Sequence, residues 1–167
     1  MPTAAKACPP LTLRLMVPRD LPHVLRIEQQ SHTRRWTVQD FLTVLQSGHT
    51  VGQVAEAGDQ VVGFVIYTVP PLATVRDDAR RRCSTEAMTL EVLNLAVAPQ
   101  WRRQGIGKAL LDKLARKLCH PGDCLHATVP ESNLPAQLLL RSAGFRATRI
   151  LRGYYETEDG YLMERCQ

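Results

Sequence analysis

The sequence predicts a single α/β domain in which a mixed central β-sheet is flanked by helices. Three observations support this class. The 167 residues suffice for one domain with a sizeable core. Short apolar runs alternate with amphipathic segments at helical spacing, and no internal repeat interrupts this alternation. Residues 1–10 are rich in proline and small residues and are expected to form a loose tail, with the domain spanning residues 11–167.

The first half of the domain is predicted to begin with a strand and two helices. LTLRLM (11–16) alternates apolar and polar residues, as a half-buried strand does. RDLPHVLRIEQQ (19–30) spaces its apolar residues like a helix. Thr37 is expected to cap a second helix that ends before Gly48. Residues 49–69 contain two strand-like runs separated by Gly58-Asp59, which indicates a hairpin.

The second half begins with a polar, arginine-rich connection over residues 70–88, and connections of that length are often functional or disordered. Residues 89–98 form a nearly continuous apolar run, typical of a central strand covered on both faces. An amphipathic helix with a leucine stripe follows. The rest is predicted as a strand over 124–130, a helix over 133–142, and two final strands around a turn at Glu158-Asp159-Gly160.

The formal net charge of +5 favours an anionic partner: a phosphate-rich cofactor, nucleic acid or an acidic peptide. Much of the excess lies in the arginines of the 76–82 segment, and such a cluster is usually a solvated loop. Nucleic acid is the least favoured partner because these arginines lack interleaved aromatic residues for base stacking. No apolar run approaches the roughly 18 residues of a membrane span. The N-terminus has no apolar segment of a secretory signal.

The five cysteines are an odd number without a C-x-x-C pair, which predicts reduced thiols in a cytoplasmic protein. Cys119-His120 followed by Cys124 and His126 suggests a zinc site at first sight. Only one such cluster is present, whereas structural zinc spacings need two. No metal is therefore expected.

A turn with two glycines joins the predicted central strand to the next helix, within QWRRQGIGKALL (100–111). It departs from the dinucleotide pattern G-x-G-x-x-G because Leu110 replaces the third glycine. It departs from the P-loop because Ala109 replaces the hydroxyl residue and Arg102 the first glycine. The free N–H groups of a helix N-terminus still suit a pyrophosphate, and Arg103 adds positive charge. A tight turn whose glycines serve geometry alone is the alternative.

Longer stretches around this turn resemble a known family. LNLAVAPQWRRQGIGKALLDKL (93–114) resembles the acetyl-CoA binding core of the GNAT N-acetyltransferases, whose signature is Q/R-x-x-G-x-G/A after a central strand. SNLPAQLLLRSAGF (132–145) is similar to the family's next helix. GYYETEDG (153–160) and QQSHTRRWTVQDF (29–41) are similar to segments of the branch that acetylates protein N-termini, including that of a ribosomal protein. The resemblance covers most of the chain from about residue 11 onward.

The resemblance implies the GNAT fold, acetyl-CoA as co-substrate and direct acetyl transfer to an amine, above all the α-amine of a protein or peptide N-terminus. A GNAT enzyme acting on a small-molecule amine and a catalytically silent acyl-CoA-binding module are the alternatives. Backbone groups of Leu95, Ala96 and Val97 would pair with the pantetheine arm, and Asn133 would contact the cofactor from the next helix. The residues implied to hold the pyrophosphate are Arg102, Arg103, Gln104, Gly105, Ile106, Gly107 and Lys108.

Acetyl transfer to an α-amine with a pKa near 8 calls for a general base. The N-terminal branch often places a Glu or His where this chain has Thr128, and the family's tyrosine acid is replaced by Leu140. Glu91 aligns, by its distance from Gly105, with the central-strand base of the histone acetyltransferases. A carboxylate in an apolar run is costly unless it is paired or useful. We therefore predict that Glu91→Gln cuts turnover with little change in acetyl-CoA affinity; pairing of Glu91 with an arginine of the 76–82 segment is the alternative.

The resemblance also supplies candidates for the acid and for the acceptor site. Tyr155 is the favoured acid, with Tyr154 beside it in the peptide site; aromatic packing at a sheet edge is the alternative for both. Arg34, Arg35 and Trp36 stand where the branch contacts its acceptor. Two arginines at this place suggest an acceptor with acidic groups, unless both face solvent.

Overall fold

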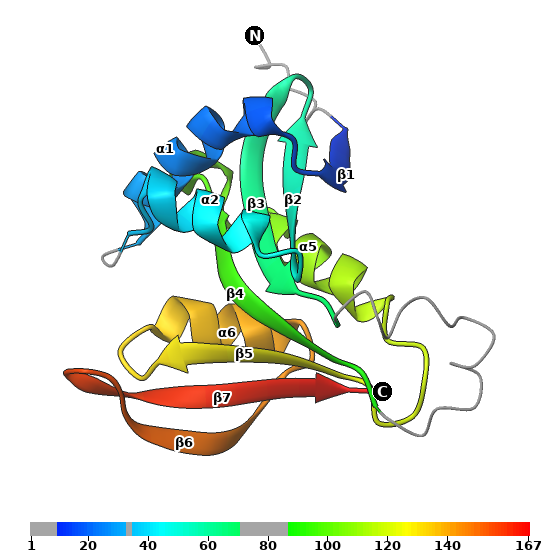
Figure 1. Ribbon diagram of the computed structural model, residues 1–167, viewed down its shortest axis with the longest axis vertical. Helices are drawn as coiled ribbons and strands as arrows, with labels where there is room; N and C mark the ends of the chain where they lie inside the picture. The colour runs from blue at the N-terminus through cyan, green and yellow to red at the C-terminus, as the bar shows by residue number, and fades with distance from the viewer. Residues whose placement is uncertain (1–9, 33–34, 71–86) are drawn as a thin grey trace, which may run out of the picture.

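A computed structural model of the chain describes residues 10–32, 35–70 and 87–167, and it shows the predicted mixed α/β domain (Figure 1). Helices and strands follow one another in the predicted order. The strands are β1 (Leu11–Leu15), β2 (Thr50–Ala57), β3 (Gln60–Thr68), β4 (Thr89–Val97), β5 (Cys124–Pro130), β6 (Arg146–Tyr155) and β7 (Glu158–Cys166). The helices of the described ranges are α1 (Leu21–Ser31), α2 (Val38–Gln46), α5 (Ile106–Ala115) and α6 (Leu134–Ser142), with short 3-10 turns η1 (Pro18–Asp20) and η2 (Pro99–Trp101).

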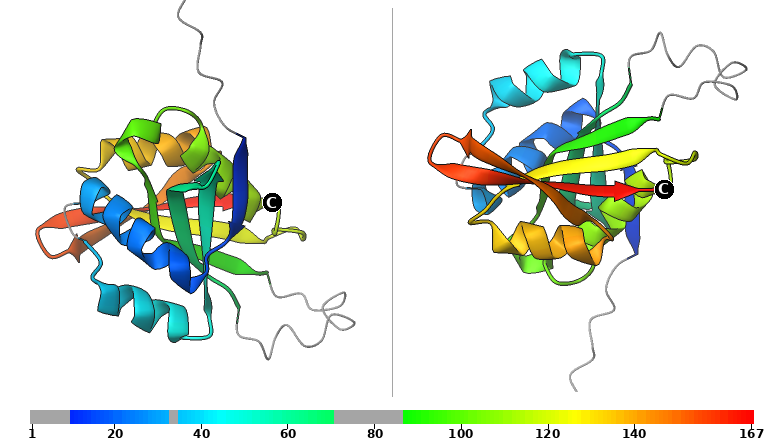
Figure 2. Two further views of the ribbon diagram at one scale, coloured as in Figure 1. Left: turned by 90° about the horizontal axis from the view of Figure 1, so that it is seen from above. Right: turned by 90° about the horizontal axis from the view of Figure 1, so that it is seen from below.

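The seven strands form one sheet in the order β1-β2-β3-β4-β5-β7-β6. β4 and β5 are parallel, as expected for strands joined by a crossover helix, and the other neighbours are antiparallel. Helices α1 and α2 cover one face of the sheet, and α5 and α6 cover the other (Figure 2). Each face has its own apolar core, one around Phe41 and Phe64 and the other around Leu110, Leu114 and Leu125.

Local sequence signals fixed several boundaries as predicted. The Thr37 hydroxyl accepts the Asp40 N–H at 3.2 Å, and the Asp40 carboxylate accepts the Thr37 N–H at 2.7 Å, so a capping box begins α2. Gly58 has a φ of +61° in the two-residue turn between β2 and β3. One prediction was wrong: Glu158-Asp159-Gly160 is the start of β7, and the turn after β6 lies at Glu156-Thr157. The ladder between β6 and β7 extends to Tyr155 and Glu158, and this pairing overrides the local turn signal.

The predicted reduced state of the cysteines is wrong for two of them. Cys124 and Cys166 form a disulfide. They occupy directly opposite positions on β5 and β7, with Cα atoms 4.1 Å apart, although they are 42 positions apart in the chain. The strand register therefore brings together two thiols that the spacing along the sequence did not relate. The disulfide also removes Cys124 from the set of conceivable zinc ligands. Cys119 is a free, exposed thiol.

A buried carboxylate fastens the two central strands where they begin. Asp123 is 2% exposed and accepts N–H groups of Met88 at 2.8 Å and of Cys119 and His120 at 2.9 Å. Met88 immediately precedes β4, and Asp123 immediately precedes β5. Asp123 thus joins the residue before β4 to the loop that leads into β5 through charge-assisted hydrogen bonds.

Two predicted features cannot be placed. Most of the proposed tail and the arginine cluster at 76–82 lie outside the described residues. Within the described ranges, no helix combines the length and the apolarity needed to cross a membrane.

Candidate active site

β4 and β5 start side by side and then part. Their parallel ladder covers Thr89–Val92 and Cys124–Ala127. β4 continues to Val97 beside β3, and β5 continues to Pro130 beside β7 (Figure 1). In the part of the chain that the structure describes, the facing edges of both strands therefore have no strand partner beyond this ladder. Unpaired strand edges present rows of N–H and C=O groups to an extended ligand.

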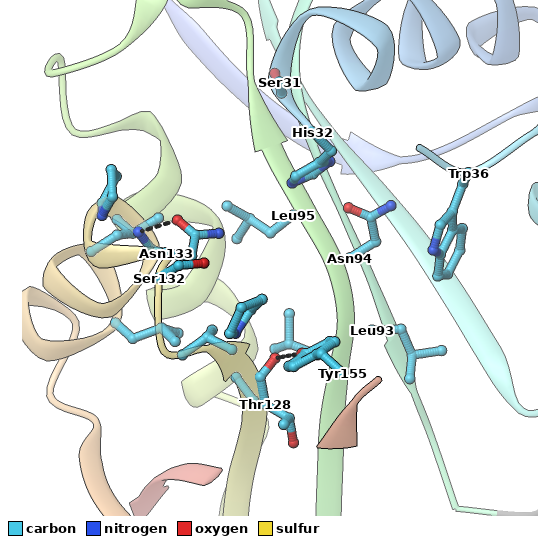
Figure 3. Close-up of a pocket in the computed structure, with 18 of the residues that line it drawn as sticks. Ser31, His32, Trp36, Leu93, Asn94, Leu95, Thr128, Ser132, Asn133 and Tyr155 are labelled. Carbon is cyan, nitrogen blue, oxygen red and sulfur yellow. Dashed lines mark hydrogen bonds between the residues drawn. The ribbon is translucent and has the colours of Figure 1, made fainter. Parts of the chain in front are cut away.

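A bulge in β4 marks the point of divergence. Ile66 of β3 pairs with Asn94, and the next residue, Tyr67, pairs with Val92, so Leu93 is the extra residue. A bulge bends its strand and re-aims the side chains that follow it. Figure 3 shows the outcome: Leu95 projects toward α6, whereas Asn94 projects to the opposite side of β4.

The gap between the strands is a cleft of about 800 Å³. β4 and β5 line its centre, the end of α1 and the following segment line one side, and the start of α6 and the β6–β7 turn line the other. Figure 3 shows residues of these segments around the cleft. The cleft thus collects side chains from segments that are far apart in the sequence.

The glycine turn lies next to the open end of β4. Arg103 and Gly105 have φ angles of 63° and 80°, and Gly105 is the N-cap of α5. Left-handed backbone of this kind in a loop before a helix gathers N–H groups into an anion-binding concavity. A Cβ atom on Gly107 would lie 3.0 Å from a methyl group of Leu139, so glycine also permits close packing of α5 on α6.

Two of the basic side chains near the turn are engaged within the protein. Arg102 donates to the Val97 carbonyl at 3.0 Å and to the Ser31 hydroxyl at 2.9 Å, which ties the end of β4 to the end of α1. Lys108 forms an ion pair with Asp112 at 2.5 Å. Gln104 donates to the Gln100 carbonyl. The predicted anion site therefore rests first on backbone N–H groups.

Asn133 lines the cleft and caps α6, as its Oδ1 accepts the Ala136 N–H at 3.2 Å. This hydrogen bond leaves the amide NH₂ pointing toward Leu95 across the gap (Figure 3). The two cofactor candidates Asn133 and Leu95 are thus brought together at the cleft.

Tyr155 lies in the cleft, and its hydroxyl donates to the Thr128 carbonyl at 2.9 Å. Tyr154 is 54% exposed and packs edge-to-face on Tyr155, with ring centroids 5.0 Å apart. Thr128 and Leu140 both line the cleft as well. The positions at which the family usually has its base and acid, Thr128 and Leu140 in this chain, thus both line the cleft.

Glu91 does not line the cleft. It belongs to the paired part of the β4–β5 ladder, opposite His126, and its N–H donates to the Thr68 hydroxyl at 3.1 Å. Its side chain is partly exposed. The structure therefore does not bring Glu91 together with the other candidate site residues. Its role as base stays a prediction.

The acceptor candidates lie around the segment between α1 and α2. Trp36 and Arg35 line the cleft, and Trp36 packs edge-to-face on Phe41 at 5.2 Å. Arg35 is exposed and donates to the His32 carbonyl at 3.1 Å. Arg34 lies outside the described residues.

Glu28 and His32 are among the polar residues of the cleft that were not predicted from the sequence. The Glu28 carboxylate lies 2.7 Å from the His32 Nδ1. Glu28 lies on the predicted helix and His32 follows its end by two residues, so their spacing of four was the available signal, because residues four apart share a helix face. The long-range partner Asn94 could not be inferred from that spacing.

The fold and the cleft together describe an α/β protein with an extended binding edge that leads to an anion-binding turn. Residues 20–145 match the acetyltransferase (GNAT) family. The chain belongs to this family of acetyltransferases.

Relatives of known activity cover nearly the whole chain. The [ribosomal protein bS18]-alanine N-acetyltransferase of Escherichia coli K12 is 32% identical over 150 residues, which are 89% of this chain and 90% of the relative. The N-alpha-acetyltransferase of Sulfurisphaera tokodaii is 29% identical over 147 residues, 86% of each chain. These relatives act as N-terminal protein acetyltransferases, in agreement with the predicted branch.

Solved structures agree with the fold. The crystal structure of the ribosomal-protein-S18-alanine N-acetyltransferase from Escherichia coli matches with a TM-score of 0.74 and 27% identity over 94% of both chains. Arabidopsis thaliana NAA60 in complex with acetyl-CoA matches with a TM-score of 0.75 and 22% identity over 95% of this chain and all of the other. The latter likeness concerns the fold alone.

Proposed function

We propose that the protein transfers the acetyl group of acetyl-CoA to the α-amine of a protein or peptide N-terminus. The observation that carries this proposal is the unpaired edge of β4, which leads from the cleft directly to the glycine turn before α5. An extended arm that ends in a pyrophosphate fits such an edge and such a turn together. The named relatives, which acetylate protein N-termini, support the same acceptor.

β4, the glycine turn and the start of α6 each hold a different part of the co-substrate. Backbone groups of Leu95, Ala96 and Val97 pair with the pantetheine arm, and the N–H groups from Arg103 to Lys108 hold the pyrophosphate. The Asn133 amide contacts the arm from the α6 side. When bound, acetyl-CoA supplies an activated acyl thioester at the point where β4 and β5 part.

The acceptor enters from the other side of the cleft. Trp36 lines the cleft, Tyr154 packs on the cleft residue Tyr155, and Arg35 adds an exposed positive charge. We propose that Arg34 and Arg35 favour acceptors with acidic residues after the N-terminus. We propose that Tyr155 protonates the leaving sulfur, for which its hydroxyl turns away from the Thr128 carbonyl.

A direct test measures CoA release from acetyl-CoA with a panel of peptides. Each peptide carries one internal lysine and is offered with a free N-terminus and with an N-formylated one. We expect release with the free peptides and none with their formylated counterparts, and mass spectrometry should place the added 42 Da on the N-terminal residue.

Other outcomes redirect the assignment. Release with formylated peptides would move the acceptor to the lysine side chain, and release with small amines alone would favour a small-molecule enzyme. Tight acetyl-CoA binding without release to any amine would leave a silent acyl-CoA module, the alternative that Leu140 and Thr128 at the usual acid and base positions raised.

A further inference from the structure

The cleft contains a buried carboxylate that the roles above do not use. The Glu28 side chain is fully buried, although it belongs to a residue type that rarely is. Burying an unpaired carboxylate costs several kcal/mol or more. Glu28 avoids this cost through three donors: the Trp36 N–H at 2.9 Å, the Asn94 amide at 3.2 Å and the His32 Nδ1 at 2.7 Å.

These contacts determine the charge of Glu28. Burial alone would raise its pKa, but the hydrogen bonds from His32, Trp36 and Asn94 outweigh burial and hold the pKa below its usual range. Glu28 is therefore an ionised carboxylate, which can only accept hydrogen bonds.

The ionised carboxylate fixes the tautomer of its neighbour. Because Glu28 can only accept, His32 must carry its proton on Nδ1. In the neutral imidazole, the lone pair then lies on Nε2, where it can accept a proton. A carboxylate that orients an imidazole in this way also stabilises the imidazolium that forms on protonation.

His32 is also in the right place. It lines the cleft, its side chain is 27% exposed, and its ring lies over β4 near Leu95 and Asn94 in Figure 3. The Asn94 amide links the pair to β4 next to the bulge. The adjacent Ser31 accepts from Arg102, so the end of α1 is tied to the residue that begins the glycine turn. His32 thus stands on the acceptor side of the point where the strands part.

We infer that His32 is the general base of acetyl transfer and that Glu28 is its positioning residue; this rests on the proposed function. His32 Nε2 takes one proton from the acceptor's ammonium group. The freed nitrogen lone pair forms the C–N bond to the thioester carbonyl carbon, and the C–S bond breaks with its electron pair going to sulfur. Tyr155 protonates the sulfur and regains the second proton of the nitrogen, so the products are the amide and the CoA thiol, and His32 returns its proton to water.

The test uses the full chain and a peptide that the wild type acetylates. A general base contributes roughly 10²–10⁴-fold to rate, so His32→Gln and His32→Ala should each lower kcat at least about 100-fold. The dissociation constant of acetyl-CoA should stay within about twofold. Imidazole added to His32→Ala should restore part of the lost kcat, because the vacated site is open to the cleft. His23→Gln, an exposed histidine on the same helix, is the matched control and should keep wild-type kcat.

Glu28→Gln keeps the size of the side chain and removes its charge. We expect it to lower kcat by roughly 10–100-fold, as loss of an orienting carboxylate does. Added imidazole should not restore this variant, because His32 still fills the site. Urea unfolding of each variant separates a loss of rate from a loss of fold.

Two results would overturn the assignment of the base. One is a kcat within threefold of wild type in both His32 variants. The other is a loss in Glu91→Gln as large as in His32→Gln, together with no imidazole rescue of His32→Ala. Absence of CoA release by the wild type with every free peptide is a separate result, which would count against the proposed function itself.

Discussion

The two ends of the β4–β5 pair differ in what holds them. At the closed end, Asp123 binds the backbone before both strands and Cys124 is bonded to Cys166. At the open end, the strands separate around the Leu93 bulge, and their facing backbone edges have no strand partner within the described ranges. The contacts at the closed end hold the two strands together, so the strands can separate at the open end and leave backbone N–H and C=O groups there for a ligand.

This difference separates stability from function along one pair of strands. Changes at the closed end should alter the free energy of unfolding and leave the acetyl-CoA affinity unchanged. Changes at the open end should weaken acetyl-CoA binding in addition to any cost in stability. Glu91 belongs to the closed half of this pair, whereas His32 faces the open half, where the cleft lies. Comparing variants of these two residues therefore tests which half supplies the base.

The largest expected effect concerns the disulfide at the closed end. The bond closes a loop of 42 residues, so Cys166→Ser should lower the free energy of unfolding by about 4 kcal/mol. Acetyl-CoA affinity should stay within twofold. Urea unfolding measures the first quantity and calorimetric titration the second, with Cys119→Ser as the control for loss of an exposed thiol.

An unfolding curve of the wild type that does not respond to dithiothreitol would contradict this expectation. The cytoplasmic location expected from sequence stays a prediction. Alkylation of cells before lysis checks it, because a protein kept in a reducing compartment would be labelled at Cys124 and Cys166.

Asp123→Asn should have the next largest effect. The substitution removes the charge that three backbone N–H groups share, and hydrogen bonds to charged groups contribute about 1.5–3 kcal/mol each. An asparagine oxygen can still accept some of them, so we expect a loss of about 3 kcal/mol in the free energy of unfolding. Acetyl-CoA binding to the folded variant should match wild type; a tenfold weaker affinity would show that the two ends are coupled.

The same carboxylate should make stability depend on acid. Burial would raise the pKa of Asp123, but the N–H groups of Met88, His120 and Cys119 hold it below its usual range. A carboxyl with a lowered folded pKa stabilises above its unfolded value, near 4, and this stabilisation is lost as pH falls through the folded value. Below about pH 4, the urea midpoint of wild type should therefore fall more steeply than that of Asp123→Asn.

The third effect compares two glycines with similar left-handed backbone conformations. Gly105 and Gly48 have φ angles of +80° and +74°, and a Cβ atom at either position meets nothing within 4 Å. Alanine should cost about 1 kcal/mol of stability at both. At Gly105 alone, the methyl group would also obstruct a pyrophosphate, and we expect acetyl-CoA to bind roughly tenfold more weakly, or about 1.4 kcal/mol. Equal affinities of the two variants would place the pyrophosphate elsewhere.

The range of the interactions that define a feature explains whether the sequence could predict it. The glycine turn, the strand before it and the helix after it are contiguous, and the cofactor candidates use mainly their backbone. Thr37 and Gly58 likewise act through neighbours a few residues away. These features were predicted because the interactions that define them are local.

The features that were missed depend on contacts across the sheet. Cys124 meets Cys166 only through the β5–β7 register, and Glu28 meets Asn94 only once α1 packs against β4. Which residues line the cleft is decided by the divergence of β4 and β5, which the apolar run of β4 does not encode. Glu91, predicted as a base from its distance to Gly105 and its place in this run, lies in the paired part of the ladder, and its role stays a prediction.

The smallest expected effect tests the acceptor side of the open end. Arg35→Gln should reduce kcat/KM for a peptide with acidic residues after its N-terminus about twofold to threefold, relative to a peptide with the matching amides, because exposed ion pairs contribute at most about 1 kcal/mol. Taking the ratio of two peptides cancels any effect transmitted through the His32 carbonyl, to which Arg35 donates. Arg26→Gln, an exposed arginine on α1, removes the same charge away from the cleft and should leave the ratio unchanged. The preference should also fade with added salt; a ratio that ignores both Arg35 and salt would show that the acceptor is selected by shape rather than by charge.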